Sequence, residues 1–210
     1  MIMNQKESNS GCRMKIFCSD VEGVWVPEVW LNFAIKTGID ELRLTTREVS
    51  DYDVLMRGRI EILKRHKLTI WDIQEVISSI GPMPGAVEAL TTIREQAQIV
   101  MVSDTFTEFA TPLMKKLGWP MLFCNYLDID EKGYVVNYHL RQPDQKRMVV
   151  LALKGLRYCV TAFGDSYNDI SMLREADRGI LFHPPQKIIE EYPQFEVVMN
   201  HNELLKTIFR

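Results

Sequence analysis

The hydrophobic pattern of this chain begins with a short buried strand. Residues 16–18 form an apolar run that is too short for a helix and is typical of a strand enclosed in a sheet. The run ends at Asp20 and Glu22, two acids separated by one residue and followed by Gly23. Because ligands bind beyond the carboxyl ends of strands in open α/β sheets, these two acids are candidate site residues.

A purely helical pattern follows this first strand. Apolar residues recur at helical spacing over residues 29–38, 55–63 and 69–80. Residues 40–53 are charged and threonine-rich and show no clear period. The segment 81–85, Gly-Pro-Met-Pro-Gly, then gives the strongest turn signal of the chain. We interpret residues 28–81 as an inserted helical cap, with hinges near residues 26–28 and 81–85.

From Gly85 onward, helix and strand patterns alternate. The expected strands lie at residues 98–102, 121–124, 158–163, 179–182 and 195–199, and a hairpin is expected over residues 126–142. Repeated strand–helix units predict a parallel sheet with helices on both faces. The core domain would therefore comprise residues 14–27 and 82–210. The polar residues 1–13 indicate a disordered tail.

Composition and net charge limit the kinds of molecule that we expect this protein to bind. Of 210 residues, 46% are hydrophobic and 25% are charged, which is ordinary for a globular protein. The formal net charge of −3 gives no reason to expect nucleic acid or an anionic membrane as a partner. No apolar run approaches the roughly 20 residues that span a bilayer. We expect a cytoplasmic protein that acts on a small molecule. Whether it forms a homodimer stays open.

Polar side chains follow three of the expected strands. They are Asp20 and Glu22, Ser103 and Asp104, and Asp165 with Asn168 and Asp169 close behind. The ends of parallel strands share one edge of a sheet, so these groups converge. Several carboxyl groups in one crevice repel each other unless a cation is present, and hard oxygen ligands favour Mg²⁺. A carboxylate-bound Mg²⁺ is typical of phosphoryl transfer.

The needs of phosphoryl transfer assign a role to each group. Asp20 is the candidate nucleophile, and Glu22 is the candidate acid and base. The Ser103 hydroxyl and the N–H groups that enter the following helix would bind phosphoryl oxygens. Lys146 is the candidate cation, and Lys154 is its rival near the far end of the same helix.

Two further acids complete this hypothesis. Asp165 would complete the metal shell. Asp169 would either hold metal-bound water or position Lys146. Each residue also has a structural alternative: the acids could cap loops, Ser103 could be only a helix N-cap, and Lys146 could lie on a solvated helix face.

The chain resembles the haloacid dehalogenase (HAD) superfamily of phosphatases in four ordered motifs. They are Asp20-Val-Glu22-Gly-Val, Ser103-Asp-Thr, Lys146, and Gly164-Asp165-Ser-x-Asn168-Asp169. The helical segment after the first motif is similar to the cap of that superfamily. The phosphoserine phosphatase branch is most similar, and within it the bacterial group that also transfers the phosphoryl group to homoserine. This narrower resemblance rests on SDVEGVWVPEVW, KTGID, TTREVSDYDVLM, DIQEVI, LRQPDQKR and AFGDSYND.

This resemblance implies a fold and a reaction. The fold is an α/β, HAD-like Rossmannoid core with a central parallel sheet and a small inserted helical cap of the C1 type. The reaction is Mg²⁺-dependent hydrolysis of O-phospho-L-serine through an aspartyl-phosphate, with phosphoryl transfer to homoserine as an added activity. An enzyme of this kind would serve serine and threonine biosynthesis.

The resemblance also implies roles for individual residues. Glu28 would bind the amino group of the substrate, and Arg59 would bind its carboxylate from the cap. The phosphate and substrate site would be lined by Ser103, Asp104, Lys146 and Asn168. The metal ligands would be Asp20, Asp165 and the main-chain carbonyl of Glu22.

Two alternatives and one departure qualify this reading. A HAD phosphatase for another small phosphomonoester stays open, because the cap residues decide specificity. A response-regulator receiver also phosphorylates an aspartate, but it lacks a helical insert of this length. Most of the superfamily has Asp where Glu22 stands, and the longer side chain could change which acceptor is activated. The bifunctional group shares this Glu.

Overall fold

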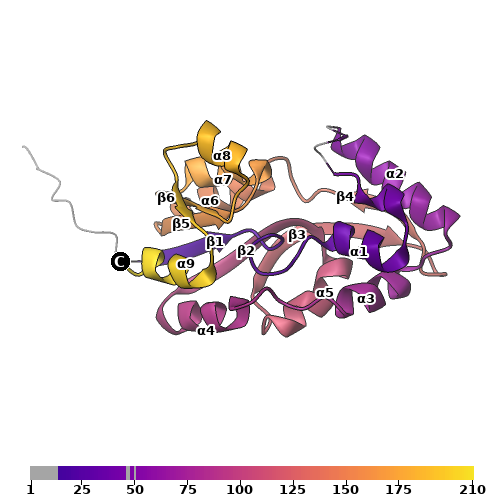
Figure 1. Ribbon diagram of the computed structural model, residues 1–210, viewed down its shortest axis with the longest axis horizontal. Coiled ribbons are helices and arrows are strands. Elements are labelled where there is room, and N and C mark those ends of the chain that lie inside the picture. The colour runs from indigo at the N-terminus through magenta and orange to yellow at the C-terminus, as the bar shows by residue number, and fades with distance from the viewer. Residues whose placement is uncertain (1–13, 46–47, 50) are drawn as a thin grey trace, which may run out of the picture.

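The computed structural model describes residues 14–45, 48–49 and 51–210. The tail predicted over residues 1–13 therefore lies outside the described residues. Over the described ranges, the chain forms a seven-stranded sheet, helices on both faces of it, and a group of helices beyond one end (Figure 1). No helix in these ranges is long and apolar enough to cross a lipid bilayer.

The sheet has the order β4-β3-β2-β1-β5-β6-β7. Its strands are β1 (Lys15–Ser19), β2 (Gln98–Phe106), β3 (Met121–Ile129), β4 (Val135–His139), β5 (Cys159–Gly164), β6 (Arg178–Phe182) and β7 (Glu196–Val198). Every neighbouring pair is parallel except β3 and β4, which form a hairpin. Ser19 at the end of β1 is aligned with Met101 of β2 and Phe163 of β5, so the residues that follow these three positions lie at one edge of the sheet.

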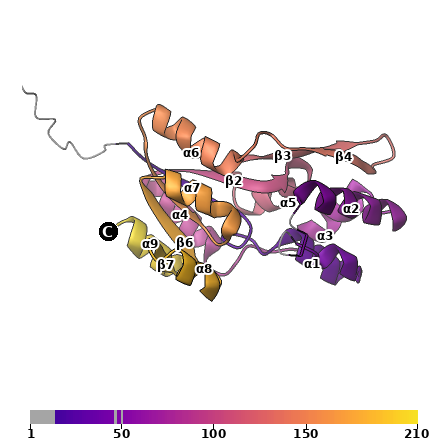
Figure 2. The same cartoon turned by 90° about the horizontal axis from the view of Figure 1, so that it is seen from above.

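Each face of the sheet is covered by helices, as Figure 2 shows from above. One layer consists of α4 (Ala86–Gln96), α5 (Thr107–Lys116) and α9 (His201–Ile208), and the other of α6 (Gln145–Gly155), α7 (Ile170–Glu175) and α8 (Gln186–Glu191). Within β1, Phe17 packs in the first layer while Ile16 and Cys18 pack in the second. Both faces of β1 are buried, which explains its continuous apolar run.

The helical insert contains α1 (Val29–Thr37), the 3₁₀ turn η1 (Asp40–Arg43), α2 (Tyr52–Arg65) and α3 (Ile70–Ser78). Its apolar side chains join the same cluster as α4 and α5. Hydrogen bonds join the β3–β4 hairpin to it: the Tyr138 hydroxyl donates to Asp53 at 2.6 Å, and the Ile70 N–H donates to the Gly133 carbonyl at 2.7 Å. The division into core and cap, with its two hinges, stays a prediction.

Two strands extend further than the sequence pattern indicates. β2 continues past Val102 to Phe106, with a shift in register between these residues. Helix α5 begins at Thr107, and its N-cap residue is Phe106. The structural alternative in which Ser103 is only a helix N-cap is therefore wrong. The Ser103 hydroxyl instead accepts a hydrogen bond from the Thr105 N–H. β3 runs on to Ile129 because it pairs there with β4.

Candidate active site

Asp20 lies at the centre of the edge where the strands end. Its N–H donates to the Phe163 carbonyl at 3.0 Å, which extends the pairing of β1 with β5 by one residue. The chain then turns sharply, because the N–H groups of Trp25 and Val26 both donate to the Val21 carbonyl. The Asp20 side chain is buried at this edge, 4% exposed.

Gly23 brings this turn directly against Asp165. Its φ is +75°, in the left-handed region that favours glycine. A Cβ atom at this position would lie 2.4 Å from the Asp165 carboxyl group. Only a glycine therefore allows the turn after β1 to approach the carboxyl group that follows β5.

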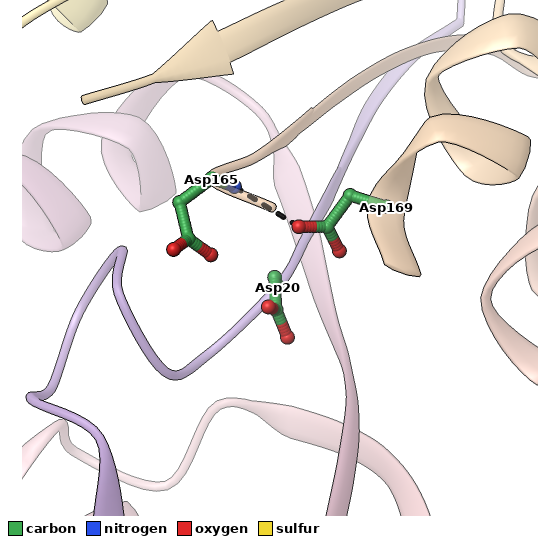
Figure 3. Close-up of side chains that lie close together, drawn as sticks. All are labelled: Asp20, Asp165 and Asp169. Carbon is green, nitrogen blue, oxygen red and sulfur yellow. Dashed lines mark hydrogen bonds between the residues drawn. The ribbon is translucent and has the colours of Figure 1, made fainter. Parts of the chain in front are cut away.

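Three acids gather at this point, as Figure 3 shows: Asp20, Asp165 and Asp169. Each offers a carboxylate oxygen, and these oxygens lie within 4.8 Å of one another. Burial and the neighbouring Asp169 raise the pKa of Asp165 to about 7, and the same two causes raise the pKa of Asp20. This crowding of negative charge favours a bound cation.

Lys146 supplies one positive charge to the cluster. Its Nζ lies 2.7 Å from Asp169 Oδ1 and 3.0 Å from Asp20 Oδ1. Burial alone would lower its pKa, but Asp169 and Asp20 raise it overall. The rival Lys154 lies elsewhere, with its Nζ 2.8 Å from the Glu175 carbonyl. Of the two lysines, the structure brings Lys146 to the site.

Asp169 holds Lys146 and the start of the last motif together. One carboxylate oxygen contacts Lys146, and the other accepts the N–H groups of Asp165 and Ser166, each at 3.0 Å. The first of these N–H contacts is the dashed line of Figure 3. The residues 167–169 form a short 3₁₀ turn, η2, before α7. Asp169 therefore contacts Lys146 directly, and its role in positioning that lysine or in holding metal-bound water stays a prediction.

The donor set fits Mg²⁺, which prefers carboxylate oxygens and water. Asp169 already uses both oxygens on protein donors, so Asp20 and Asp165 have the carboxylates best placed to bind a metal. The Glu22 carboxylate lies outside the cluster of three acids. A metal contact from Glu22 would therefore use its main-chain carbonyl, as the sequence resemblance implies.

The Glu22 side chain instead binds the start of α1. Its Oε2 accepts a hydrogen bond of 2.8 Å from the Val29 N–H. Burial, with a contribution from the charge of Glu28, raises the pKa of Glu22 to about 7. A carboxyl group with this pKa can exchange a proton readily near neutral pH.

A cavity of about 310 Å³ opens between the strand ends and the helical insert. It joins all the predicted site residues except Asp169, and its lining also includes Thr45, Tyr52, Trp30, Ser166 and Tyr167. Ser103 is buried at its base, 2% exposed. Asp104 accepts hydrogen bonds from Gln145 and Asn168, which together with Lys146 lower its pKa against the effect of burial.

Arg59 forms the opposite wall, on α2. It is 7% exposed, and its guanidinium lies 4.4 Å from the centre of the Trp30 ring. One terminal nitrogen donates to the Leu44 carbonyl, but Nε has no hydrogen-bond partner among the described residues. Burial lowers the pKa of Arg59 to about 10. Glu28 lines the same cavity and is exposed.

Among the residues that sequence reasoning missed, three contact predicted site residues directly. Trp30 stacks on Arg59, the Tyr52 hydroxyl lies 3.4 Å from the Asp104 carbonyl, and Gln145 binds Asp104. Gln145 precedes Lys146 directly, which was the one available signal. Trp30 and Tyr52 resemble ordinary core aromatics in sequence, so their place in the cavity depends on how the insert folds over the sheet.

Comparisons with known proteins agree with this geometry. The phosphoserine phosphatase of Pseudomonas syringae pv. tomato is 54% identical, over 95% of this chain and 84% of the relative. The phosphoserine phosphatase ThrH of Pseudomonas aeruginosa is 53% identical, over 94% and 96%. A substrate-bound phosphoserine phosphatase structure shares the fold, with a TM-score of 0.75 at 22% identity over 93% of this chain and 98% of that one.

A family model also matches most of the chain. The model describes haloacid dehalogenase-like hydrolases and covers residues 14–177, from the residue before β1 to the residue before β6. This range contains every residue of the cavity and both surfaces that enclose it. The chain therefore belongs to the haloacid dehalogenase-like hydrolase family.

Proposed function

We propose that this protein hydrolyses O-phospho-L-serine in a Mg²⁺-dependent reaction through an aspartyl-phosphate at Asp20. The observation that carries the proposal is the pairing, in one cavity, of a buried nucleophile with the buried guanidinium of Arg59. A small phosphorylated amino acid has a phosphate for the first and a carboxylate for the second. Relatives named phosphoserine phosphatase at 53% and 54% identity support this substrate.

The first half-reaction forms the phospho-enzyme. An Asp20 carboxylate oxygen attacks phosphorus, and the bond from phosphorus to the serine oxygen breaks. Glu22 gives its proton to the leaving oxygen, since its pKa of about 7 keeps it partly protonated at neutral pH. Lys146 and the Ser103 hydroxyl donate to the phosphoryl oxygens. Mg²⁺ held by Asp20, Asp165 and the Glu22 carbonyl would neutralise charge on those oxygens.

The second half-reaction returns Asp20 to its starting state. Glu22, now ionised, takes a proton from water, and the water oxygen attacks phosphorus. The bond from phosphorus to the Asp20 oxygen breaks, and inorganic phosphate is released. Homoserine would enter in the same way, through its hydroxyl group, and leave as phosphohomoserine. A hydrogen bond from the Val29 N–H holds the Glu22 side chain at the junction with the insert, and this fixed position supports a role toward either acceptor.

Specificity would come from the insert. Arg59 would bind the substrate carboxylate through its unpartnered Nε and a terminal nitrogen, and Glu28 would bind the amino group. A simple alkyl phosphate would leave the buried Arg59 charge unpaired, which is costly. This reasoning favours phosphoserine over the alternative of another small phosphomonoester.

An assay of phosphoserine with and without homoserine tests the proposal. Free phosphate and phosphohomoserine are measured, together with a panel of other phosphomonoesters. We expect phosphoserine to be among the best substrates, and Arg59→Met to raise its KM while changing the KM of ethyl phosphate little. The proposal fails if phosphoserine ranks low in the panel. The cytoplasmic location, the absence of nucleic-acid and membrane partners, and the homodimer stay predictions.

A further inference from the structure

Gln145 connects the helix that carries Lys146 to the end of β2. It is the first residue of α6 and is buried, 4% exposed. Its side-chain Nε2 donates to the Ser103 carbonyl at 2.9 Å and to Asp104 Oδ1 at 2.9 Å. A primary amide has two N–H donors, so both are used on the end of one strand.

Asp104 is held just short of a close contact with Lys146. Its Oδ1 accepts from Gln145, and its Oδ2 accepts from Asn168 at 2.8 Å. Lys146 Nζ lies 3.9 Å from that Oδ2, which is beyond hydrogen-bonding distance. An ammonium has three N–H donors, and the contacts with Asp169 and Asp20 account for two of them.

We propose that Gln145 is a positioning residue that holds the Asp104 carboxylate away from Lys146. The third donor of Lys146 then stays available to a phosphoryl oxygen of the substrate. Without Gln145, attraction would draw Asp104 onto the ammonium, and a carboxylate would occupy the place of the phosphoryl group. This inference rests on the proposed function only in placing a phosphoryl group beside Lys146.

The oxygen atom of the Gln145 amide supports a role for this side chain beyond packing. Gln145 Oε1 is buried and has no hydrogen-bond partner among the described residues. Burying an acceptor without a partner destabilises the fold, whereas a methionine of similar length would fill the space without that loss. The side chain thus carries a stability cost on one atom while its other atom fixes Asp104.

The test measures inorganic phosphate binding by equilibrium dialysis in the presence of Mg²⁺. We expect Gln145→Met to weaken phosphate binding by about tenfold, the scale of one charge-assisted hydrogen bond, without lowering Tm. In turnover, KM for the phosphorylated substrate should rise more than kcat falls. Gln145→Leu repeats the change with a different shape, in case methionine packs badly.

The decisive step is to repeat the change in an Asp104→Asn background. Asparagine carries no charge that could pair with Lys146, so Gln145→Met should then change phosphate binding by less than about twofold. A purely structural role for Gln145 would give the same loss in both backgrounds and would overturn the inference. Gln74→Met is the matched control, because Gln74 donates to the Glu108 carbonyl away from the cavity.

Failure of this inference can be told apart from failure of the proposed function. If the protein binds phosphate but does not hydrolyse phosphoserine, the substrate assignment is wrong, and the two-background comparison still decides the role of Gln145. If the unmodified protein does not bind phosphate, or if Gln145→Met and Gln145→Leu bind it normally, Gln145 does not act in this way.

Discussion

The Oε2 atom of Glu22 accepts a hydrogen bond of 2.8 Å from the N–H of Val29. The proposed acid and base is thereby fixed to the first residue of helix α1, at the junction between the sheet edge and the insert. The contact orients the carboxylate without using its second oxygen, which can serve the reaction.

Replacing Glu22 with glutamine should separate its two roles. The amide oxygen of Glu22→Gln can still accept from Val29, so thermal stability should stay close to that of the unmodified protein. It cannot move a proton, so kcat should fall by roughly a hundredfold to ten-thousandfold. Steady-state kinetics and thermal unfolding check this, and a variant with near-normal kcat would contradict the role.

The length of the Glu22 side chain should affect the choice of acceptor. Glu22→Asp shortens the side chain by one methylene group. Its carboxylate can then no longer keep the hydrogen bond with the Val29 N–H and reach the acceptor at the same distance as before. We expect the ratio of phosphohomoserine to free phosphate to change in a competition assay with both acceptors present. An unchanged ratio would show that the arm length does not set acceptor choice.

Two lysines on the same helix should differ strongly in their effect on stability. Lys146→Met leaves Asp20 and Asp169 buried without their counter-charge, and should lower the free energy of unfolding by about 3–5 kcal/mol in metal-free buffer. Lys154→Met removes a partly exposed contact with Asp177, and should lower it by about 1 kcal/mol or less. Urea denaturation measures both, and equal losses would contradict the burial argument.

Gly23 and Gly38 have similar left-handed backbones but different surroundings. In Gly38→Ala, the added Cβ has no atom within 4 Å. The variant should therefore lower the free energy of unfolding only by the backbone strain, about 1 kcal/mol. Gly23→Ala would place its Cβ against the Asp165 carboxyl group. We expect Gly23→Ala, but not Gly38→Ala, to raise the Mg²⁺ concentration needed for half-maximal activity by about tenfold or more. A matching response from Gly38→Ala would remove Asp165 from the explanation.

Removing one acid from the cluster should have opposite effects with and without metal. Asp165→Asn removes one of three crowded carboxyl groups, so its Tm should exceed that of the unmodified protein in EDTA. Mg²⁺ should stabilise the unmodified protein but not the variant, because the variant has lost a ligand. Thermal unfolding in both buffers tests this, and an equal response to Mg²⁺ would exclude Asp165 as a ligand.

His201 should make stability depend on pH. Its two ring nitrogens lie 2.9 Å from the Val24 carbonyl and 3.1 Å from the Pro84 carbonyl, and burial lowers its pKa. A base whose pKa is lowered by folding binds fewer protons when folded, so stability falls as pH drops below about 6.5. The nearby charge of Glu88 opposes this effect, because a negative charge raises the pKa of His201. His201→Asn should reduce this pH dependence in urea titrations, and an unchanged slope would contradict it.

Local patterns in the sequence were sufficient for much of the fold. Alternating strand and helix patterns predicted the parallel sheet, because each strand and each helix can be recognised from the spacing of its own apolar residues. The polar residues at the strand ends predicted the acid cluster, because parallel strands end at the same edge. The lengths of β2 and β3 were underestimated, since those strands extend through pairing with residues elsewhere in the chain rather than through their own apolar pattern.

The sequence by itself determined which acids would meet at the edge of the sheet and in which order the strands would supply them, because these features depend on short-range periodicity and topology. The role of Asp20 as the nucleophile stays a prediction. Only the tertiary structure decided that Glu22 binds Val29 and that Gln145 binds Asp104. It also brings Lys146, the lysine that the sequence already favoured over Lys154, into the cluster. These contacts join residues on different elements. Their geometry depends on how helices pack across the sheet, which no local pattern encodes.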